Sequence, residues 1–163
     1  MSATDDLLRR AASYAEHFDK AGLPMQPASR VAIVACMDAR LNPYGIFGLS
    51  EGEAHVIRNA GGLVTDDVVR SLAISQRLLG TQEVILVHHA DCGMRTFRDE
   101  DFNGQLEREA GSPPPWATPS FPPSTEDVRQ SLARLRESPF LAHYGSLRGF
   151  MYDERTGRLT EVA

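Results

Sequence analysis

Short, continuously apolar runs alternate along this chain with stretches of helical periodicity. Residues 31–35 and 84–87 are unbroken apolar runs, and residues 55–57 form a weaker one. Such runs are typical of strands buried on both faces of a parallel sheet. Between the run at 55–57 and the run at 84–87, apolar residues recur at helical spacing from a cap at Thr65 to a stop at Gly80. The order strand, strand, helix, strand predicts an α/β fold with a central, mostly parallel sheet of four strands flanked by helices.

The N-terminal segment predicts a separate amphipathic helix over residues 4–20. Thr4 is its expected cap, and Gly22 and Pro24 are its expected end. This helix stands apart from the strands that follow. It is therefore a candidate arm that packs on a partner subunit rather than on its own core.

The C-terminal third predicts a loop, a helix and a hairpin. Residues 111–123 hold six of the ten prolines, which favours a rigid surface loop. The alternative is a docking segment that clasps a neighbouring subunit through Trp116 and Phe121. A helix is expected from near Ser124 to just before Pro139. The chain should finish in an edge hairpin, with strands at 147–152 and 158–162 joined through a turn at 156–157.

Length and charge limit the classes of function. The 163 residues predict one domain, residues 1–163, which buries roughly 70% of its unfolded surface. A formal net charge of −5 argues against nucleic acid as a partner. No stretch approaches the roughly 20 apolar residues of a membrane span, and the N-terminus lacks the basic and apolar blocks of a signal peptide. We therefore expect a cytoplasmic protein with no membrane partner, in which cysteines serve as ligands or nucleophiles rather than in a disulfide.

Both cysteines lie in reactive segments that follow the apolar runs. Residues 36–40 (Cys-Met-Asp-Ala-Arg) follow the run at 31–35, and residues 89–93 (His-Ala-Asp-Cys-Gly) follow the run at 84–87. Ligands of open α/β sheets bind outside the carboxyl ends of the strands, so neighbouring strands would bring these segments to one rim. Cys36, His89 and Cys92 form a Cys₂His set with an open fourth position, which is a catalytic zinc pattern.

Asp38 has two possible roles at such a site. It can close the site as a fourth metal ligand, or it can be held by Arg40 beside a zinc-bound water and orient it. Two thiolates make zinc a weaker Lewis acid than three histidines do, so an orienting carboxylate–guanidinium pair would matter more.

Simpler interpretations remain open from the residues alone. Buried cysteines are often only small hydrophobes, and Asp38 with Arg40 can be an ordinary surface ion pair worth roughly 0–1 kcal/mol. A redox role lacks a Cys-x-x-Cys pair, and a Cys–His protease leaves the second cysteine unexplained.

The other histidines are expected to be structural or exposed. Strand alternation should point His88 away from the His89 ligand, into a packed and hydrogen-bonded position. His55 should lie in a strand, and His17 and His143 should be surface positions.

At these residues the chain resembles a β-class carbonic anhydrase, of the short actinobacterial or mycobacterial-like form. The resemblance is carried jointly by residues 35–40 (Ala-Cys-Met-Asp-Ala-Arg), 52–61 (Gly-Glu-Ala-His-Val-Ile-Arg-Asn-Ala-Gly) and 89–93. It extends to residues 149–153 (Gly-Phe-Met-Tyr-Asp), and so covers nearly the whole chain.

The resemblance implies one Zn²⁺ per subunit on Cys36, His89 and Cys92, with water or Asp38 as the fourth ligand. It implies reversible hydration of CO₂ to bicarbonate and a proton by a zinc-bound hydroxide, with Asp38 and Arg40 as the catalytic pair. Gly61 and Gly62 would let the backbone approach the substrate. A homodimer or homotetramer, with the N-terminal helix across the partner, is also implied.

Three functions follow as hypotheses. The first is carbonic anhydrase activity. The second is hydrolysis of carbonyl sulfide or carbon disulfide on the same zinc scaffold, because a hydroxide that attacks CO₂ can attack its sulfur analogues. The third is a non-catalytic module stabilised by a zinc site that is permanently closed by Asp38.

Overall fold

The fold was analysed in a computed structural model that describes residues 2–121, 124–142 and 145–163. The expected surface position of His143 and the last two residues of the proline-rich loop lie outside the described residues.

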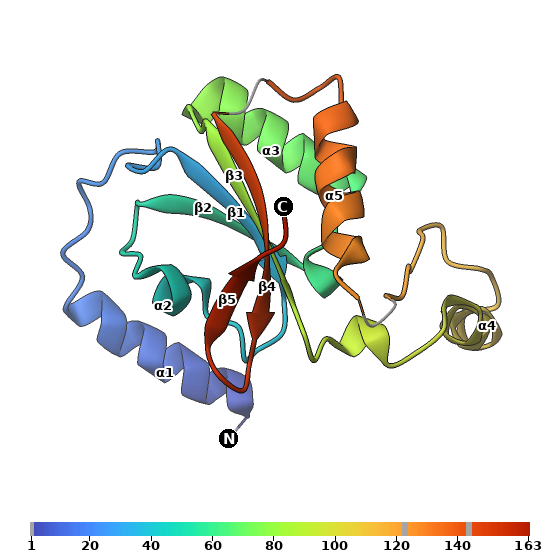
Figure 1. Cartoon of the computed structure of the whole chain (residues 1–163). Coiled ribbons are helices and arrows are strands. Elements are labelled where there is room, and N and C mark those ends of the chain that lie inside the picture. The colour runs from blue at the N-terminus through green and yellow to red at the C-terminus, as the bar shows by residue number, and fades with distance from the viewer. Residues whose placement is uncertain (1, 122–123, 143–144) are drawn as a thin grey trace.

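A five-stranded sheet forms the centre of the protein, in the order β2-β1-β3-β4-β5 (Figure 1). Its strands are β1 (Val31–Cys36), β2 (Ala54–Asn59), β3 (Glu83–His89), β4 (Ser146–Asp153) and β5 (Arg158–Glu161). The first four are parallel, and β5 pairs antiparallel with β4. This confirms the predicted parallel sheet of four strands with a hairpin at its edge.

The register of the sheet brings three strand ends to one rim. β1 lies between β2 and β3, and Cys36 at its end is opposite Asn59 at the end of β2. Ala35 is opposite Val87, two residues before the end of β3 at His89. The expected neighbourhood of the three reactive segments is therefore correct.

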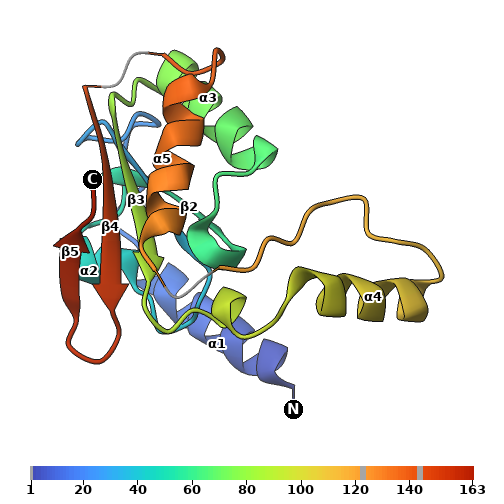
Figure 2. The same cartoon turned by 45° about the vertical axis from the view of Figure 1, so that its right-hand side comes forward.

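Two helices cover one face of the sheet, α3 (Asp66–Leu79) and α5 (Glu126–Glu137) (Figures 1 and 2). As predicted, the Thr65 hydroxyl caps α3 by accepting from the Val68 N–H, and Gly80 ends it in a left-handed conformation. α5 begins at Glu126, close to the expected start, and ends before Pro139. The core between these helices and the sheet contains buried residues of all these elements: Ala32, Val34, Val68, Leu72, Val84, Leu86, Val128, Leu132 and Leu135.

The opposite face carries the short helix α2 (Pro43–Phe47) and a second apolar cluster. That cluster includes both cysteines, together with Ile33, Ala35, Leu41, Val87 and Phe121. Two single-turn 3₁₀ helices, η1 (Ala60–Gly62) and η2 (Gly93–Arg95), follow β2 and the turn after β3 respectively. The reactive rim is thus built on the most buried strands of the sheet.

The N-terminal helix α1 (Ala3–Glu16) differs from its prediction at both ends. Ser2, not Thr4, is the cap, because its side chain accepts from the Asp5 N–H while the Asp5 carboxylate accepts from the Ser2 N–H. The helix ends at Glu16 rather than near residue 20. None of its residues is buried by the rest of the described chain, so no tertiary packing supports a further turn.

Helix α4 (Asp99–Ala110) and the loop that follows it project from the body of the protein (Figure 2). The helix was not predicted, because its apolar residues are few and Gly104 interrupts it. Residues 111–121 form neither helix nor strand, as expected for the proline-rich loop. Trp116 is 63% exposed, but Phe121 is buried against its own chain, so the idea that Phe121 anchors a neighbouring subunit is wrong.

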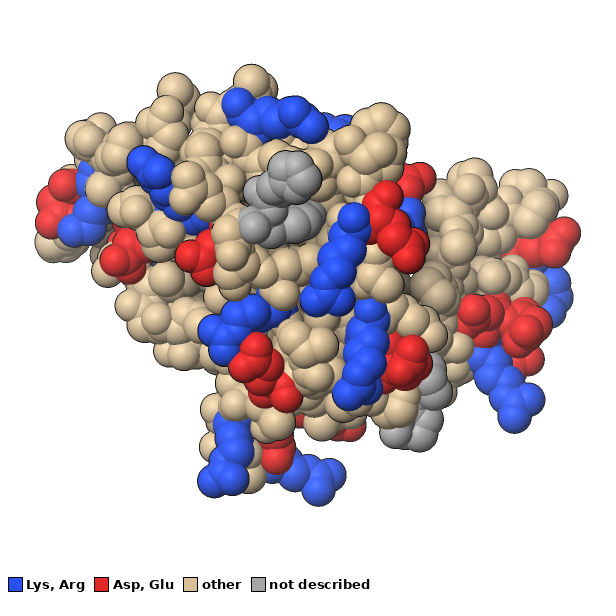
Figure 3. Space-filling model, turned by 45° about the horizontal axis from the view of Figure 1, so that its top comes forward, with Lys and Arg blue, Asp and Glu red and all other residues tan. Residues whose placement is uncertain are grey.

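Acidic and basic side chains are interleaved over the face shown in Figure 3. None of the helices in the described part of the chain has the length and apolar content needed to span a lipid bilayer.

Candidate metal centre and its hydrogen-bond network

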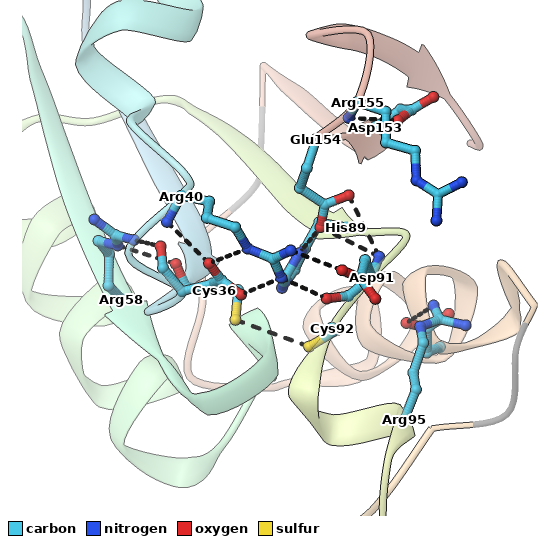
Figure 4. A network of polar contacts seen from close by, with 12 residues as sticks. Cys36, Arg40, Arg58, His89, Asp91, Cys92, Arg95, Asp153, Glu154 and Arg155 are labelled. Carbon is cyan, nitrogen blue, oxygen red and sulfur yellow. Dashed lines mark hydrogen bonds and ion pairs between the residues drawn. The ribbon is translucent and has the colours of Figure 1, made fainter.

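Three donor side chains converge at the rim of the sheet. Among the described residues, Cys36, His89 and Cys92 form a buried group in which one potential ligand atom from each lies within 4.8 Å of the others. Cys36 comes from the end of β1, His89 from the end of β3, and Cys92 from the turn that follows. Both cysteines are free thiols, with Sγ atoms 3.9 Å apart (Figure 4).

The His89 ring is oriented for a metal by a carboxylate. Its Nδ1 faces Glu154 Oε1, and Glu154 lies in the turn between β4 and β5 (Figure 4). Its Nε2 is buried and finds no hydrogen-bond partner among the described residues. A buried imidazole nitrogen without a partner is costly, and a metal ion would satisfy it. The donor set therefore fits a metal, and its soft sulfur and imidazole ligands are those that zinc prefers.

The two thiols share one hydrogen bond and differ in acidity. The hydrogen bond from Cys92 lowers the pKa of Cys36, whereas the same contact, together with burial, raises the pKa of Cys92. Burial opposes protonation of His89, but the nearby Cys36 sulfur and the Glu154 carboxylate outweigh it and raise the pKa of His89. The metal-free pair thus retains a proton that a metal would displace.

Asp38 is turned toward Arg40 and is not a member of the three-residue donor group in the described chain. Its Oδ1 accepts from the Arg40 backbone N–H at 2.9 Å and from Nε at 3.0 Å, and its Oδ2 accepts from Nη2 at 2.8 Å. These hydrogen bonds hold the pKa of Asp38 well below its usual range, so the carboxylate stays ionised. The expected pairing of Asp38 with Arg40 is present.

Arg58 fixes the backbone between Cys36 and this pair. It donates from Nε to the Cys36 carbonyl at 3.0 Å and from Nη2 to the Asp38 carbonyl at 2.7 Å. The expectation that Arg58 shapes the rim therefore corresponds to a defined contact.

Two further acidic residues belong to this network, and neither was predicted. Glu154 contacts His89 and also accepts from the Asp91 N–H. Asp91 contacts Arg40. Glu154 is 65 residues from His89 along the chain, and only the pairing of β3 with β4 brings its turn to the rim. For Asp91, its place between His89 and Cys92 was the only available signal.

Gly61 and Gly62 lie beside the ligand strands in conformations that suit glycine, with φ of 80° and 69°. A Cβ on Gly62 would lie 2.9 Å from the Cys36 backbone nitrogen, and one on Gly61 would lie 2.7 Å from the Phe121 ring. Gly62 therefore lies against the backbone of β1, whereas Gly61 lies against the Phe121 and Met94 side chains. Contact with a substrate stays a prediction.

An apolar cavity of about 410 Å³ adjoins the centre. Its lining combines residues next to the cysteines with others from η1 and from the projecting segment: Met37, Asn59, Ala60, Leu63, Thr65, Met94, Phe97, Phe102, Trp116, Ala117, Thr118 and Pro119.

The remaining histidines behave as expected where the structure describes them. His88 Nδ1 lies 2.8 Å from Asp127 Oδ2, and its Nε2 lies 3.2 Å from the Gly62 carbonyl. His55 lies in β2, with Nδ1 2.7 Å from the Ser75 hydroxyl. His17 is exposed at the end of α1.

The fold and the site define a class of protein: an α/β protein whose parallel sheet carries a Cys₂His donor set at the carboxyl ends of its strands. One imidazole nitrogen of that set has no hydrogen-bond partner in the described chain. Comparison with known proteins narrows this class. Residues 31–116 match the carbonic anhydrase family. The chain is 58% identical to beta-carbonic anhydrase 1 of Mycobacterium tuberculosis over 162 residues, which is 99% of each chain.

Two other comparisons agree on the scaffold. The crystal structure of carbonic anhydrase from Streptococcus mutans superposes with a TM-score of 0.93 at 42% identity, covering 100% of this chain and 99% of that one. A carbon disulfide hydrolase of Acidithiobacillus thiooxidans is 30% identical, covering 80% of this chain and 75% of its own. The chain belongs to the carbonic anhydrase family, and within it to the β class.

Proposed function

We propose that the protein catalyses the reversible hydration of CO₂ with one zinc ion held by Cys36, His89 and Cys92. The observation that carries the metal assignment is the buried His89 Nε2, which has no partner in the described chain and lies in one donor group with two free thiols. Membership of the β-carbonic anhydrase family supports the reaction. Reduced cysteines in this role also support the expected cytoplasmic location.

Bound zinc would lower the pKa of a water molecule so that hydroxide is available near neutral pH. The chain's own residues then have to position that nucleophile. Asp38 is an ionised hydrogen-bond acceptor beside the donor group, and Arg40 donates a hydrogen bond to each of its two carboxylate oxygens. We assign Asp38 the role of orienting the nucleophile and Arg40 that of holding Asp38 off the metal.

Substrate access fits the apolar cavity. CO₂ carries no net charge, and the apolar lining of the cavity beside Met37 and Met94 suits it. Gly61 and Gly62 are assigned to the substrate side because neither has a side chain, Gly62 lies against the Cys36 backbone, and Gly61 lies beside Met94, which lines the cavity. Bicarbonate then leaves toward solvent, and one proton must follow for each turnover.

Hydrolysis of carbonyl sulfide or carbon disulfide is the second candidate. It is favoured by the similarity to carbon disulfide hydrolases and by an apolar cavity that suits these substrates as well as CO₂. Headspace gas measurements on zinc-loaded protein separate the two. Rapid loss of carbonyl sulfide or carbon disulfide with negligible CO₂ hydration would overturn our assignment.

The role of Arg40 is tested by Arg40→Ala. The variant should keep full zinc content by metal analysis, while stopped-flow CO₂ hydration falls by about 100-fold or more because Asp38 is free to turn toward the metal. Arg155→Ala is the matched control, since it removes an exposed arginine of the nearby hairpin turn. Unchanged hydration in Arg40→Ala would refute the role. Zinc-loaded wild-type protein that is inactive at every pH would instead favour the non-catalytic zinc module.

We also propose that the protein acts as a homodimer or a larger homo-oligomer. Two unpartnered apolar surfaces support this: α1, whose Leu7 and Leu8 are 61% and 63% exposed, and the projecting segment with Trp116. Leu8→Glu should lower the mass measured by light scattering toward that of the 17.9 kDa chain. An unchanged mass would exclude α1 from the interface.

A further inference from the structure

The guanidinium of Arg40 is engaged along two separate edges. Its Nε and Nη2 donate to the two oxygens of Asp38. Its Nη1 donates to Asp91 Oδ2 at 2.7 Å, and Nη2 donates a second bond to the Asp91 carbonyl at 2.7 Å. Arg40 therefore bridges Asp38 and Asp91 with both of its nitrogen-bearing edges occupied (Figure 4).

Asp91 belongs to the same turn as two of the proposed ligands. It lies two residues after His89 and one before Cys92, and its backbone N–H faces Glu154 at 3.2 Å. Glu154 also holds His89. The partner of Arg40 is thus fixed to the frame of the metal centre rather than to a separate loop.

We propose that Asp91 is a positioning residue that latches Arg40 in place, and so keeps Asp38 turned away from the metal. This inference rests on the proposed function, in which Asp38 must orient the nucleophile rather than close the site. Asp91 acts only through Arg40 and contacts neither substrate nor metal.

The physical argument is one of preorganisation. The Arg40 side chain is 49% exposed and that of Asp91 is 67% exposed, so a single ion pair here contributes little by charge alone. A free arginine side chain samples many rotamers, and pairing with Asp38 would require all of that freedom to be lost. With one edge already bound to Asp91, Arg40 loses little more when it binds Asp38. The latch should therefore favour the Asp38–Arg40 arrangement by roughly two- to fivefold.

Charge sharing would act in the opposite direction. If Asp91 mainly neutralised Arg40, its removal would strengthen the hold of Arg40 on Asp38. Two substitutions separate these effects. Asp91→Ala removes the side-chain acceptor, whereas Asp91→Asn keeps an oxygen that can accept from Nη1 and removes only the charge. Latching predicts that Asn behaves nearly as the wild type.

The first experiment uses metal-free protein and does not depend on activity. The exchange of the Arg40 Nε–H with water is measured by NMR. We expect it to be roughly two- to fivefold faster in Asp91→Ala and near the wild-type rate in Asp91→Asn. Asp153→Asn is the matched control, because it removes a negative charge from the neighbouring hairpin without a contact to Arg40, and its exchange should be unchanged.

The second experiment compares crystal structures of the zinc-loaded proteins at one pH. Asp91→Ala should show Asp38 on the metal in a larger fraction of sites, at full zinc content, and its kcat should fall more than its KM rises. Wild-type exchange in Asp91→Ala, or an Asp38 that is held by Arg40 as firmly as before, would overturn the latch. If the wild-type protein failed to hydrate CO₂, the proposed function would be wrong. The exchange rates would still show whether Asp91 holds Arg40 in place.

Discussion

His88 and His89 are neighbours on β3 with opposite surroundings. His88 points to the side of the sheet covered by α5, where its two ring nitrogens lie near Asp127 and the Gly62 carbonyl. His89 points to the rim, where Glu154 holds Nδ1 and Nε2 has no partner in the described chain. Both rings are buried and both contact a carboxylate. What separates the structural His88 from the proposed metal ligand His89 is the one ring nitrogen of His89 that has no partner in the described chain.

The same carboxylate–histidine contact therefore serves two purposes. On the α5 side it completes a buried polar network, in which Arg95 also donates to Asp127. At the rim it orients a ring whose other nitrogen has no partner in the described chain and can serve as a metal donor. Substitutions at the rim should therefore change zinc binding, whereas substitutions on the α5 side should not.

The largest difference in zinc binding is expected when each of the two histidines is replaced in turn by glutamine. His89→Gln removes a proposed ligand, so zinc affinity should fall by more than about 100-fold and hydration should be lost. His88→Gln keeps an amide near Asp127 and should retain one zinc per chain. Metal analysis after dialysis against a weak chelator measures both. Retention of zinc by His89→Gln would remove the basis of the comparison.

A smaller loss is expected at the carboxylate of the rim. Glu154→Gln keeps a hydrogen-bond acceptor for His89 but removes its charge, and zinc affinity should fall by about tenfold to 100-fold. Glu161→Gln is the control, since Glu161 lies on the same hairpin and pairs with Arg148. Competition with a chromophoric chelator gives the affinities. Equal affinities for the two variants would mean that Glu154 does not tune the ligand.

Sequence reasoning brought Cys36, His89 and Cys92 together because they lie at, or just after, the ends of apolar runs that buried strands explain. It also placed His88 on the opposite side from His89, since alternation along a strand is a local property. The short spacing of Asp38 and Arg40 directly after Cys36 also pointed to their pairing. For these residues, local pattern and short spacing contain most of the information.

Contacts between segments that are distant in the sequence could not be predicted from the local pattern. Glu154 reaches His89 only because β4 pairs beside β3, and nothing in a β-turn sequence marks one carboxylate as an orienting group. The end of α1 was misplaced for a related reason, because the helix has no packing partner in the described chain to extend it. Docking of Phe121 on a neighbouring subunit was left open as an alternative because a proline-rich segment gives no signal of where it folds back. In the structure its ring stacks on His88.

The smallest effect on the metal should come from the α5 side, where the network is structural. Asp127→Asn leaves the amide near His88 but weakens the contact with Arg95, so the free energy of unfolding should fall by about 2 kcal/mol. Zinc affinity should stay within about threefold of the wild type, since Asp127 contacts no proposed ligand. Glu126→Gln, on the exposed neighbouring position of α5, controls for the loss of one charge. Urea unfolding of metal-free protein gives the first quantity and chelator competition the second. A loss of zinc affinity as large as that of Glu154→Gln would show that the two sides of β3 act as one unit.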